Sequence, residues 1–228
     1  MWVMLLASML FLATHLGISS TTLRARLVAM LGENGYLAAY SLVAAVTLGY
    51  LIWIYAAVPR YDYFWSPSPA LYLAAKLIMP VAMILLLGGF MVRNPTAVGM
   101  EGSLREGPQD EPARGVTRIT RHPFQWAVVL WAFSHLLANG DQVSVVFFAT
   151  FMVLGLAGSV LIDRKKAARL GDDWQPYAAV TSNLPFAAIL GGRNRLAWRE
   201  LIMPAAAGAV GYVLVFWAHP WIAGVRIV

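Results

Sequence analysis

The chain has 228 residues and a formal net charge of +6, and 60% of its residues are hydrophobic while only 12% are charged. Soluble globular domains carry roughly 25% charged residues, so this composition indicates a protein of the lipid bilayer, and we expect no nucleic-acid partner despite the basic charge. The absence of cysteine excludes disulfides, zinc–thiolate sites, iron–sulfur clusters and thiolate ligation of haem.

Long apolar runs predict the fold class, which is all-α: a polytopic membrane helical bundle with about six transmembrane helices. No basic residue precedes Arg24 and no small-residue cleavage site follows the first apolar run, so we expect a retained anchor there and not a signal peptide. The turn signal Asn139-Gly140-Asp141 predicts a tight hairpin between the fourth and fifth spans. The predicted spans are residues 2–20, 36–57, 69–91, 123–139, 142–162 and 200–218.

The distribution of lysine and arginine predicts the orientation. Only Arg60 and Arg226 fall in loops on one side of the predicted membrane, against fourteen basic residues on the other. Since basic loops stay in the cytoplasm, we expect both termini to be periplasmic in a bacterial inner membrane. The fourteen are Arg24, Arg26, Arg93, Arg105, Arg114, Arg118, Arg121, Arg164, Lys165, Lys166, Arg169, Arg193, Arg195 and Arg199.

Two polar loops, residues 92–122 and 163–199, are the cytoplasmic parts of a single transmembrane domain over residues 1–228. Neither loop is long enough to build a core of its own. The first is rich in glycine and proline, which predicts flexibility in its middle. The second begins with a basic, helix-like run that ends at a glycine.

Histidines in or beside the predicted spans are the candidate functional residues. His15 lies in the first span, and His122 and His135 open and close the fourth. Ionisable groups are costly in a membrane and usually have a partner or a function. A structural role would be a neutral imidazole that donates to a carbonyl of a neighbouring helix. Two such residues on different spans favour metal or haem ligation, and without cysteine the natural cofactor is a bis-histidine haem.

His122 and His219 each precede a proline at a span boundary. Pro123 suits the first turn of a helix, so a helix start with Arg121 at the lipid phosphates is the simplest interpretation of that motif. It does not explain His122 itself. His219 lies at the periplasmic end of the sixth span, and we interpret it as an interfacial terminus and not a catalytic residue.

Helix geometry limits how the histidines can pair. His122 and His135 are 13 residues apart, roughly 20 Å along a helix and on different faces, so they cannot bind one iron. Depth favours a meeting of His15 with His122. Pairing His15 with His135 requires helix tilt to absorb an offset of roughly 10 Å.

Three stretches, LFLATHLGISS, RHPFQWAVVLWAFSHLLANGD and LGDDWQPYAAVTSNLPF, together resemble the NnrU family of integral membrane proteins over nearly the whole chain. The RHP-x(11)-H-x(5)-D pattern is the most specific part. That family is associated with denitrification gene clusters and is similar to the plant and cyanobacterial 15-cis-zeta-carotene isomerases, which hold haem b. The resemblance implies that His15 and His135 are the haem ligands and that His122 is a further important position.

A more distant resemblance is to the isoprenylcysteine carboxyl methyltransferases, which also open a span with RHP. Here Gln125 and Ala127 stand where that family has tyrosine and glycine, and its acidic pair is reduced to one aspartate. The resemblance implies a shared helical hairpin and, as an alternative cofactor, S-adenosylmethionine in a cytoplasmic pocket. Its site would comprise Arg121, His122, Asp163, Trp174 and Tyr177.

We therefore carry two main hypotheses. The first is a haem b protein that isomerises a lipid-soluble polyene, acts as an oxidoreductase or senses nitric oxide. Arg118 or Arg121 would then bind the haem propionates, and Trp131, Phe133 and Phe124 would line the pocket. The second is a membrane methyltransferase. A non-catalytic assembly or regulatory factor for a reductase is the simplest alternative to both.

Overall fold

The computed structural model describes residues 1–97, 99–104 and 111–227. Arg105, one of the basic residues predicted to be cytoplasmic, lies outside the described residues. Within these ranges the regular structure is helical, apart from one isolated bridge between Tyr63 and Asp141, which confirms the all-α class. The helices are α1 (Trp2–Leu12), η1 (Ala13–Ile18), α2 (Thr22–Ala57), α3 (Pro69–Met91), η2 (Glu101–Leu104), α4 (Val116–Ile119), α5 (Pro123–Ala138), α6 (Gln142–Leu170), η3 (Gly171–Asp173), α7 (Gln175–Val180), α8 (Ala187–Leu190), η4 (Trp198–Leu201) and α9 (Ile202–Ala223).

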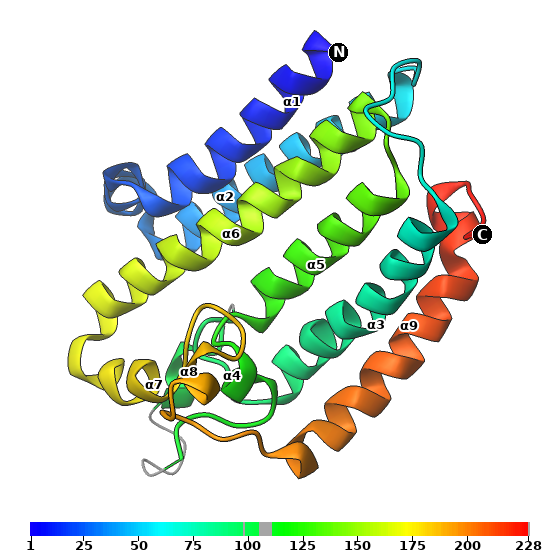
Figure 1. The fold of residues 1–228 in the computed structure, drawn as a ribbon. Coiled ribbons are helices and arrows are strands. Elements are labelled where there is room, and N and C mark those ends of the chain that lie inside the picture. The colour runs from blue at the N-terminus through cyan, green and yellow to red at the C-terminus, as the bar shows by residue number, and fades with distance from the viewer. Residues whose placement is uncertain (98, 105–110, 228) are drawn as a thin grey trace.

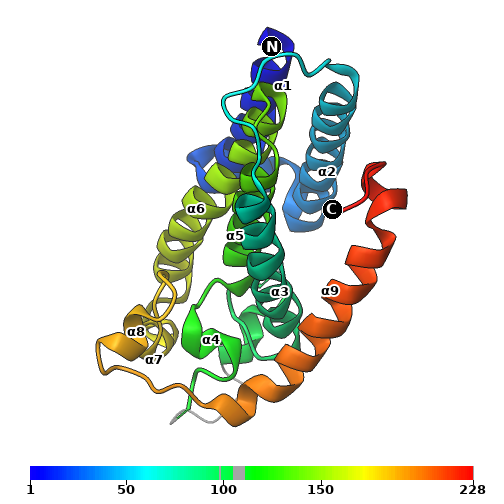
Figure 2. The same ribbon diagram turned by 45° about the vertical axis from the view of Figure 1, so that its right-hand side comes forward.

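The long helices stand side by side in the order α9, α3, α5 and α6, and both α1 and α2 pack against α6 (Figure 1). The short helices α4, α7 and α8 gather at one end of the bundle, and the N-terminus lies at the opposite end along the helix axes (Figure 2). Helices α2, α3, α6 and α9 are long and apolar enough to cross a membrane, and α1 and α5 are shorter apolar helices. The chain is therefore a multi-pass membrane protein, while the count of six spans and the periplasmic termini stay predictions.

Two helices are longer than the predicted spans. Residues 22–35, predicted as a loop, are mostly helical, because α2 starts at Thr22 and is only interrupted at Gly32, whose φ of 71° suits glycine. Helix α6 continues past residue 162 to Leu170 and stops at Gly171, where φ is 51°. The predicted basic helical run with a glycine stop is thus confirmed.

An aromatic and aliphatic core joins α1, α2, α5 and α6 at the end of the bundle that carries the N-terminus. Its members share near-complete burial, as expected for close-packed side chains. They are Met4, Ala7, Phe11, Leu51, Ile54, Ala132, Val143, Phe147 and Phe148.

The predicted hairpin between α5 and α6 is present, and the segment of residues 58–68 covers its turn. Asp141 caps α6 by accepting a hydrogen bond from the Ser144 amide at 2.8 Å. The Phe64 amide donates to the Gly140 carbonyl at 2.8 Å, and the Gln142 amide donates to the Asp62 carbonyl at 2.9 Å. Backbone of the covering segment therefore lies directly on the turn.

This close approach predicts that Gly140→Ala is strongly destabilising. An added Cβ would lie 1.7 Å from the carbonyl oxygen of Trp65, which no rotamer change can relieve. We expect a loss of roughly 1–3 kcal/mol or more, as for overpacked sites, measured as thermal unfolding by circular dichroism in detergent. The matched control is Gly158→Ala in α6, where nothing lies within 4 Å of the new Cβ. Equal melting temperatures for the two variants would contradict the prediction.

Candidate functional site

His15 and His135 share one hydrogen-bonding arrangement. Nδ1 of His15 lies 2.9 Å from the carbonyl oxygen of Phe11, and Nδ1 of His135 lies 2.8 Å from that of Trp131. A carbonyl oxygen only accepts, so Nδ1 carries the proton and Nε2 carries the lone pair. Within the described part of the chain, neither Nε2 makes a hydrogen bond. Metal-ligating imidazoles are arranged in this way, with the second ring nitrogen donating to a carbonyl or carboxylate.

His15 lies in η1, a short π-helical segment, and not in the regular helix that the sequence predicted. The Thr14 hydroxyl donates to the Leu10 carbonyl at 2.9 Å, and the Ser19 hydroxyl donates to the carbonyl of His15. These side chains compete with the backbone for helix carbonyls, and Gly17 weakens the helix further. The polar run THLGISS was the sequence signal for this widened turn, a feature often found at functional sites.

His135 is surrounded by aromatic rings. Its ring centre lies 4.8 Å from that of Phe148 and 5.0 Å from that of Trp131. His219 of α9 is a third neighbour, with ring centres 6.4 Å apart and planes inclined by 23°. Sequence reasoning did not find this neighbour, because the two residues are 84 positions apart in the chain.

Aromatic side chains separate His15 from His135. The His15 ring packs on Phe11 at 4.0 Å, Phe11 packs on Phe151 at 5.4 Å, Phe151 packs on Trp131 at 5.3 Å, and Trp131 packs on His135. No ring contact or hydrogen bond joins the two histidines directly in the described structure. The described residues also contain no group of three or more potential metal ligands.

His122 contacts neither of these histidines and belongs to a buried polar cluster at the opposite end of α5. Its side chain is fully buried, and Nε2 lies 2.7 Å from the Asp163 carboxylate of α6. Arg121 approaches the same carboxylate at 3.6 Å, donates to the Thr181 carbonyl at 2.9 Å and lies 5.9 Å from the centre of the Trp174 ring.

The segment of residues 181–186 is fixed to this cluster by hydrogen bonds. The Arg121 amide donates to the Ser182 carbonyl at 2.9 Å, and the Thr120 hydroxyl donates to the Asn183 carbonyl at 2.7 Å. The Phe186 amide reaches the Ile119 carbonyl at 2.8 Å. Phe186 adopts φ of 64°, an uncommon conformation for a bulky residue that these contacts hold in place.

Three buried polar atoms of the same region have no hydrogen-bond partner among the described residues: Nδ1 of His122, Nε of Arg121 and Oε1 of Gln125. Burial lowers the pKa of His122, and the Asp163 carboxylate opposes that shift. Burial also raises the pKa of Tyr177. The cluster thus holds a neutral imidazole and a neutral phenol beside a carboxylate and a guanidinium.

Arg118, a predicted propionate ligand, forms a structural ion pair. Its Nε and one terminal nitrogen donate to the two Glu200 carboxylate oxygens at 2.9 and 3.0 Å, and the other terminal nitrogen donates to Asn194 at 2.9 Å. This bidentate pair raises the pKa of the buried guanidinium. It joins α4 to η4, the turn that begins α9.

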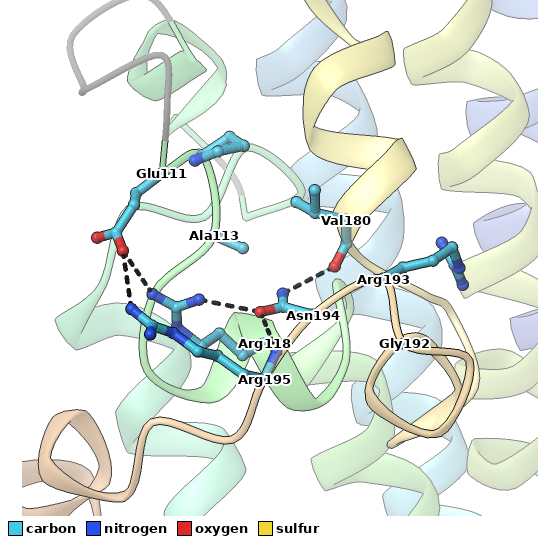
Figure 3. Close-up of a pocket in the computed structure, with 9 residues that line it drawn as sticks. Glu111, Ala113, Arg118, Val180, Gly192, Arg193, Asn194 and Arg195 are labelled. Carbon is cyan, nitrogen blue, oxygen red and sulfur yellow. Dashed lines mark hydrogen bonds and ion pairs between the residues drawn. The ribbon is translucent and has the colours of Figure 1, made fainter.

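A pocket of about 410 Å³ opens beside Arg118. Figure 3 shows the residues that line it. Glu111 forms ion pairs with Arg118 at 3.6 Å and with Arg195 at 3.5 Å. Arg193, also in the lining, donates to the Ala179 and Thr181 carbonyls. Of the predicted site residues only Arg118 lines this pocket. Phe124 packs on Phe90, and it and Phe133, both predicted to line a haem pocket, are each 42% exposed on the outer surface of the bundle.

The fold and these side chains define a polytopic helical membrane protein with two imidazoles held by helix carbonyls in its apolar helices and a buried polar cluster at one end. The chain belongs to the NnrU family, whose sequence profile, described as "NnrU protein", matches residues 3–227.

Two curated relatives carry the name 15-cis-zeta-carotene isomerase, chloroplastic. The Arabidopsis thaliana protein is 33% identical over 114 residues, which cover 48% of this chain and 31% of the relative. The Zea mays protein is 37% identical over 82 residues, covering 36% and 22%. The chain therefore matches less than a third of the length of these relatives. No solved structure matches the chain.

The environment of His122 predicts a specific acid sensitivity. Because burial lowers its pKa below the ordinary value of 6.5, the unfolded chain takes up a proton that the folded chain resists. The associated stability is complete above pH 6.5 and is lost as the pH falls through the lowered pKa. We expect His122→Gln, which keeps a donor toward Asp163, to lose less melting temperature between pH 7.5 and 5 than the wild type. In free energy of unfolding, the difference between the two proteins should be about 1.4 kcal/mol per unit by which the pKa of His122 is lowered. Parallel pH profiles would contradict this.

The Arg118–Glu200 pair predicts a large cost for Glu200→Gln. The substitution leaves a guanidinium with 6% exposure facing a neutral amide, so we expect a loss of roughly 1–3 kcal/mol in unfolding experiments. The control is Glu33→Gln, which breaks the exposed pair with Arg24 and should cost less than about 1 kcal/mol. Equal losses of unfolding free energy in the two variants would show that the Arg118–Glu200 pair stabilises the fold no more than an exposed pair does.

Proposed function

We propose that this protein is a haem b protein of a bacterial inner membrane, with the loops 92–122 and 163–199 in the cytoplasm. The observation that carries the proposal is the shared state of His15 and His135: Nδ1 of each lies on a helix carbonyl, and Nε2 of each has no hydrogen bond from the described residues. Imidazole is a common haem ligand, and each of these rings has the tautomer that ligation requires. Phe11, Phe151 and Trp131 separate the two rings, so one iron bound by both would require these side chains to move. The family resemblance implies that His15 and His135 are the two haem ligands, and His122 is the alternative ligand.

The chain's own residues would orient the cofactor and shield it from water. Trp131 and Phe148 pack on His135 and hold its ring in one orientation. Both predicted propionate ligands lie at the opposite end of α5 from His135, where Arg118 is held by Glu200 and Asn194 and Arg121 by Asp163 and the Thr181 carbonyl, so neither is placed to bind the propionates of a haem at His135. A bound haem would supply an iron centre that takes up a ligand or one electron.

A lipid-soluble polyene is the substrate class that the relatives favour, since both are named as carotene isomerases. Entry of such a molecule from the bilayer is compatible with the apolar outer surfaces of α2 and α9, which expose Trp53 and Trp217. The family's association with denitrification makes nitric oxide the second ligand to test. In that case the protein would sense the gas or support a reductase as an assembly or regulatory factor.

A methyltransferase is the second candidate, favoured by the polar cluster. The residues of that alternative site do converge, since Asp163 contacts His122 and Arg121, and Trp174 contacts Arg121 and Tyr177. His122 and Asp163 bond to each other and Arg121 donates to the Ala178 and Thr181 carbonyls, so S-adenosylmethionine would have to replace some of these contacts. Calorimetric titration with S-adenosylmethionine, compared between wild type and Asp163→Asn, tests this candidate.

Haem binding is tested by absorption spectra of detergent-purified protein, oxidised and dithionite-reduced, after expression with ample haem precursor. We expect a Soret band with the wild type and its loss or shift with His135→Gln, which keeps the size and removes the imidazole. Phe133→Leu is the control, because that exposed residue lies on the same helix and contributes no ligand. A wild type without a Soret band would overturn the proposal and favour the methyltransferase or the non-catalytic factor.

A further inference from the structure

The pocket of about 410 Å³ beside Arg118 lies at the level where the last long helix begins. Residues 192–195 form one side of it, and an apolar helix long enough to cross a membrane starts soon after them, at Trp198. Arg118 binds Glu200, in the first turn of that helix, at 2.9 Å. The segment between α8 and α9 runs along this end of the bundle (Figure 1). Because charged groups are costly in hydrocarbon, this ion pair and the pocket beside it belong at the level of the lipid headgroups.

The lining of the pocket is basic. Arg118, Arg193 and Arg195 line it together with one acidic residue, Glu111. Glu200 lies outside the lining and balances the charge of Arg118. Arg193 donates to backbone carbonyls, and it pairs with no carboxylate of the described residues. With three arginines against two carboxylates, the described residues around the pocket carry a net positive charge.

The Glu111 carboxylate is held only loosely. It is shared by the guanidinium groups of Arg114, Arg118 and Arg195, at 3.5, 3.6 and 3.5 Å. Hydrogen bonds between a guanidinium and a carboxylate are about 2.7–2.9 Å long, so these ion pairs lack close contact. Figure 3 shows the Glu111 carboxylate facing Arg118 and Arg195. The Arg195 side chain is 80% exposed, so its donors are accessible to another anion. A phosphate group, which offers several acceptor oxygens, suits such donors.

Exposed leucines flank the basic segment. Leu190 ends helix α8 with 85% of its surface exposed, and Leu196 follows Arg195 with 50% exposed. Single exposed apolar residues are common on protein surfaces. These two border the arginines on both sides and precede the exposed Trp198 at the start of a membrane helix, and such a mixture of basic, aromatic and aliphatic residues is typical of a lipid interface. A matching ligand has an anionic head and an apolar body.

We propose that this pocket binds the phosphate headgroup of an anionic phospholipid, with Arg193 and Arg195 as donors and with Leu190 and Leu196 beside the acyl chains. Basic pockets at the ends of membrane helices are typical sites for such headgroups. The volume is within the range of about 300–1,000 Å³ for small-molecule sites. A soluble phosphate would use the same arginines but would gain nothing from the leucines. The inference does not depend on haem binding, since the pocket lies at the opposite end of α5 from His135.

The test follows the melting temperature of the purified protein in a neutral detergent while lipid is added. We expect phosphatidylglycerol to raise the melting temperature with increasing concentration, as a ligand of the folded state does. Phosphatidylcholine, whose headgroup is zwitterionic, should raise it less. Glycerol phosphate carries the charged group without acyl chains and should also raise it less. Equal stabilisation by phosphatidylcholine, or by glycerol phosphate, would overturn the assignment to an anionic lipid.

Substitutions with opposite effects separate binding from folding. Arg195→Gln removes an exposed donor and should weaken phosphatidylglycerol binding about tenfold, as for the loss of one hydrogen bond between charged groups. Glu111→Gln removes the competing carboxylate and should strengthen binding, which a damaged fold would not do. The control is Arg199→Gln, which changes the net charge equally but alters no residue of the lining. Equal weakening by Arg195→Gln and Arg199→Gln, or no gain with Glu111→Gln, would overturn the proposed site.

A second experiment locates the flanking leucines relative to the bilayer. Because the chain contains no cysteine, Leu190→Cys can carry a single nitroxide label in vesicles of phosphatidylcholine and phosphatidylglycerol. We expect this label to collide more with oxygen, which concentrates in hydrocarbon, than with a water-soluble nickel complex. Asp172→Cys, at an exposed position in η3, is the control and should show the opposite preference. Collision rates typical of water at both positions would overturn the assignment to a lipid.

Discussion

Residues 118–122 are the joint on which the arrangement of the long helices depends. Arg118 holds the start of α9 through Glu200, and His122, four residues later, holds α6 through Asp163. Both pairs are largely buried, so breaking either would leave a polar or charged group without its partner, which is far more costly than losing an exposed pair. Two helices that lie apart in the row are thereby positioned by one five-residue segment.

The seam between α5 and α6 shows how this joint sets helix register. Gly155, Ser159 and Asp163 follow one another at four-residue spacing, so they share one face of α6. A side chain at Gly155 would meet the Gln125 carbonyl at 2.9 Å, the Ser159 hydroxyl accepts from Asn183 at 3.0 Å, and Asp163 binds the imidazole. One row of small and polar residues therefore fixes the depth of α5, and with it the depth of His135, which follows His122 by 13 residues.

Sequence pattern predicted the elements well because apolar runs, a turn signal and a glycine stop are local features. Asp141 and Gly171 end or begin helices where their own chemistry requires it. The contacts that define the site are not local: Arg118 finds Glu200 82 residues away, and His135 finds His219 across helix α3. The depths of single spans contain no information about the aromatic cluster between His15 and His135 or about the π-helical segment that holds His15. Side-chain packing determines these contacts, and they cannot be predicted from the periodicity of apolar residues along the sequence.

Leaving Nε2 of His135 without a hydrogen bond from the described residues costs free energy. In a membrane region, partial exposure of His135 means contact with hydrocarbon, where an unsatisfied polar group is expensive. A leucine or phenylalanine at such a position would pack without that penalty, and the neighbouring residues Trp131 and Phe148 show that the site accepts apolar side chains. The Trp131 carbonyl that holds Nδ1 of His135 satisfies only one of the two ring nitrogens. A bound group that accepts the lone pair of Nε2 would remove the remaining cost.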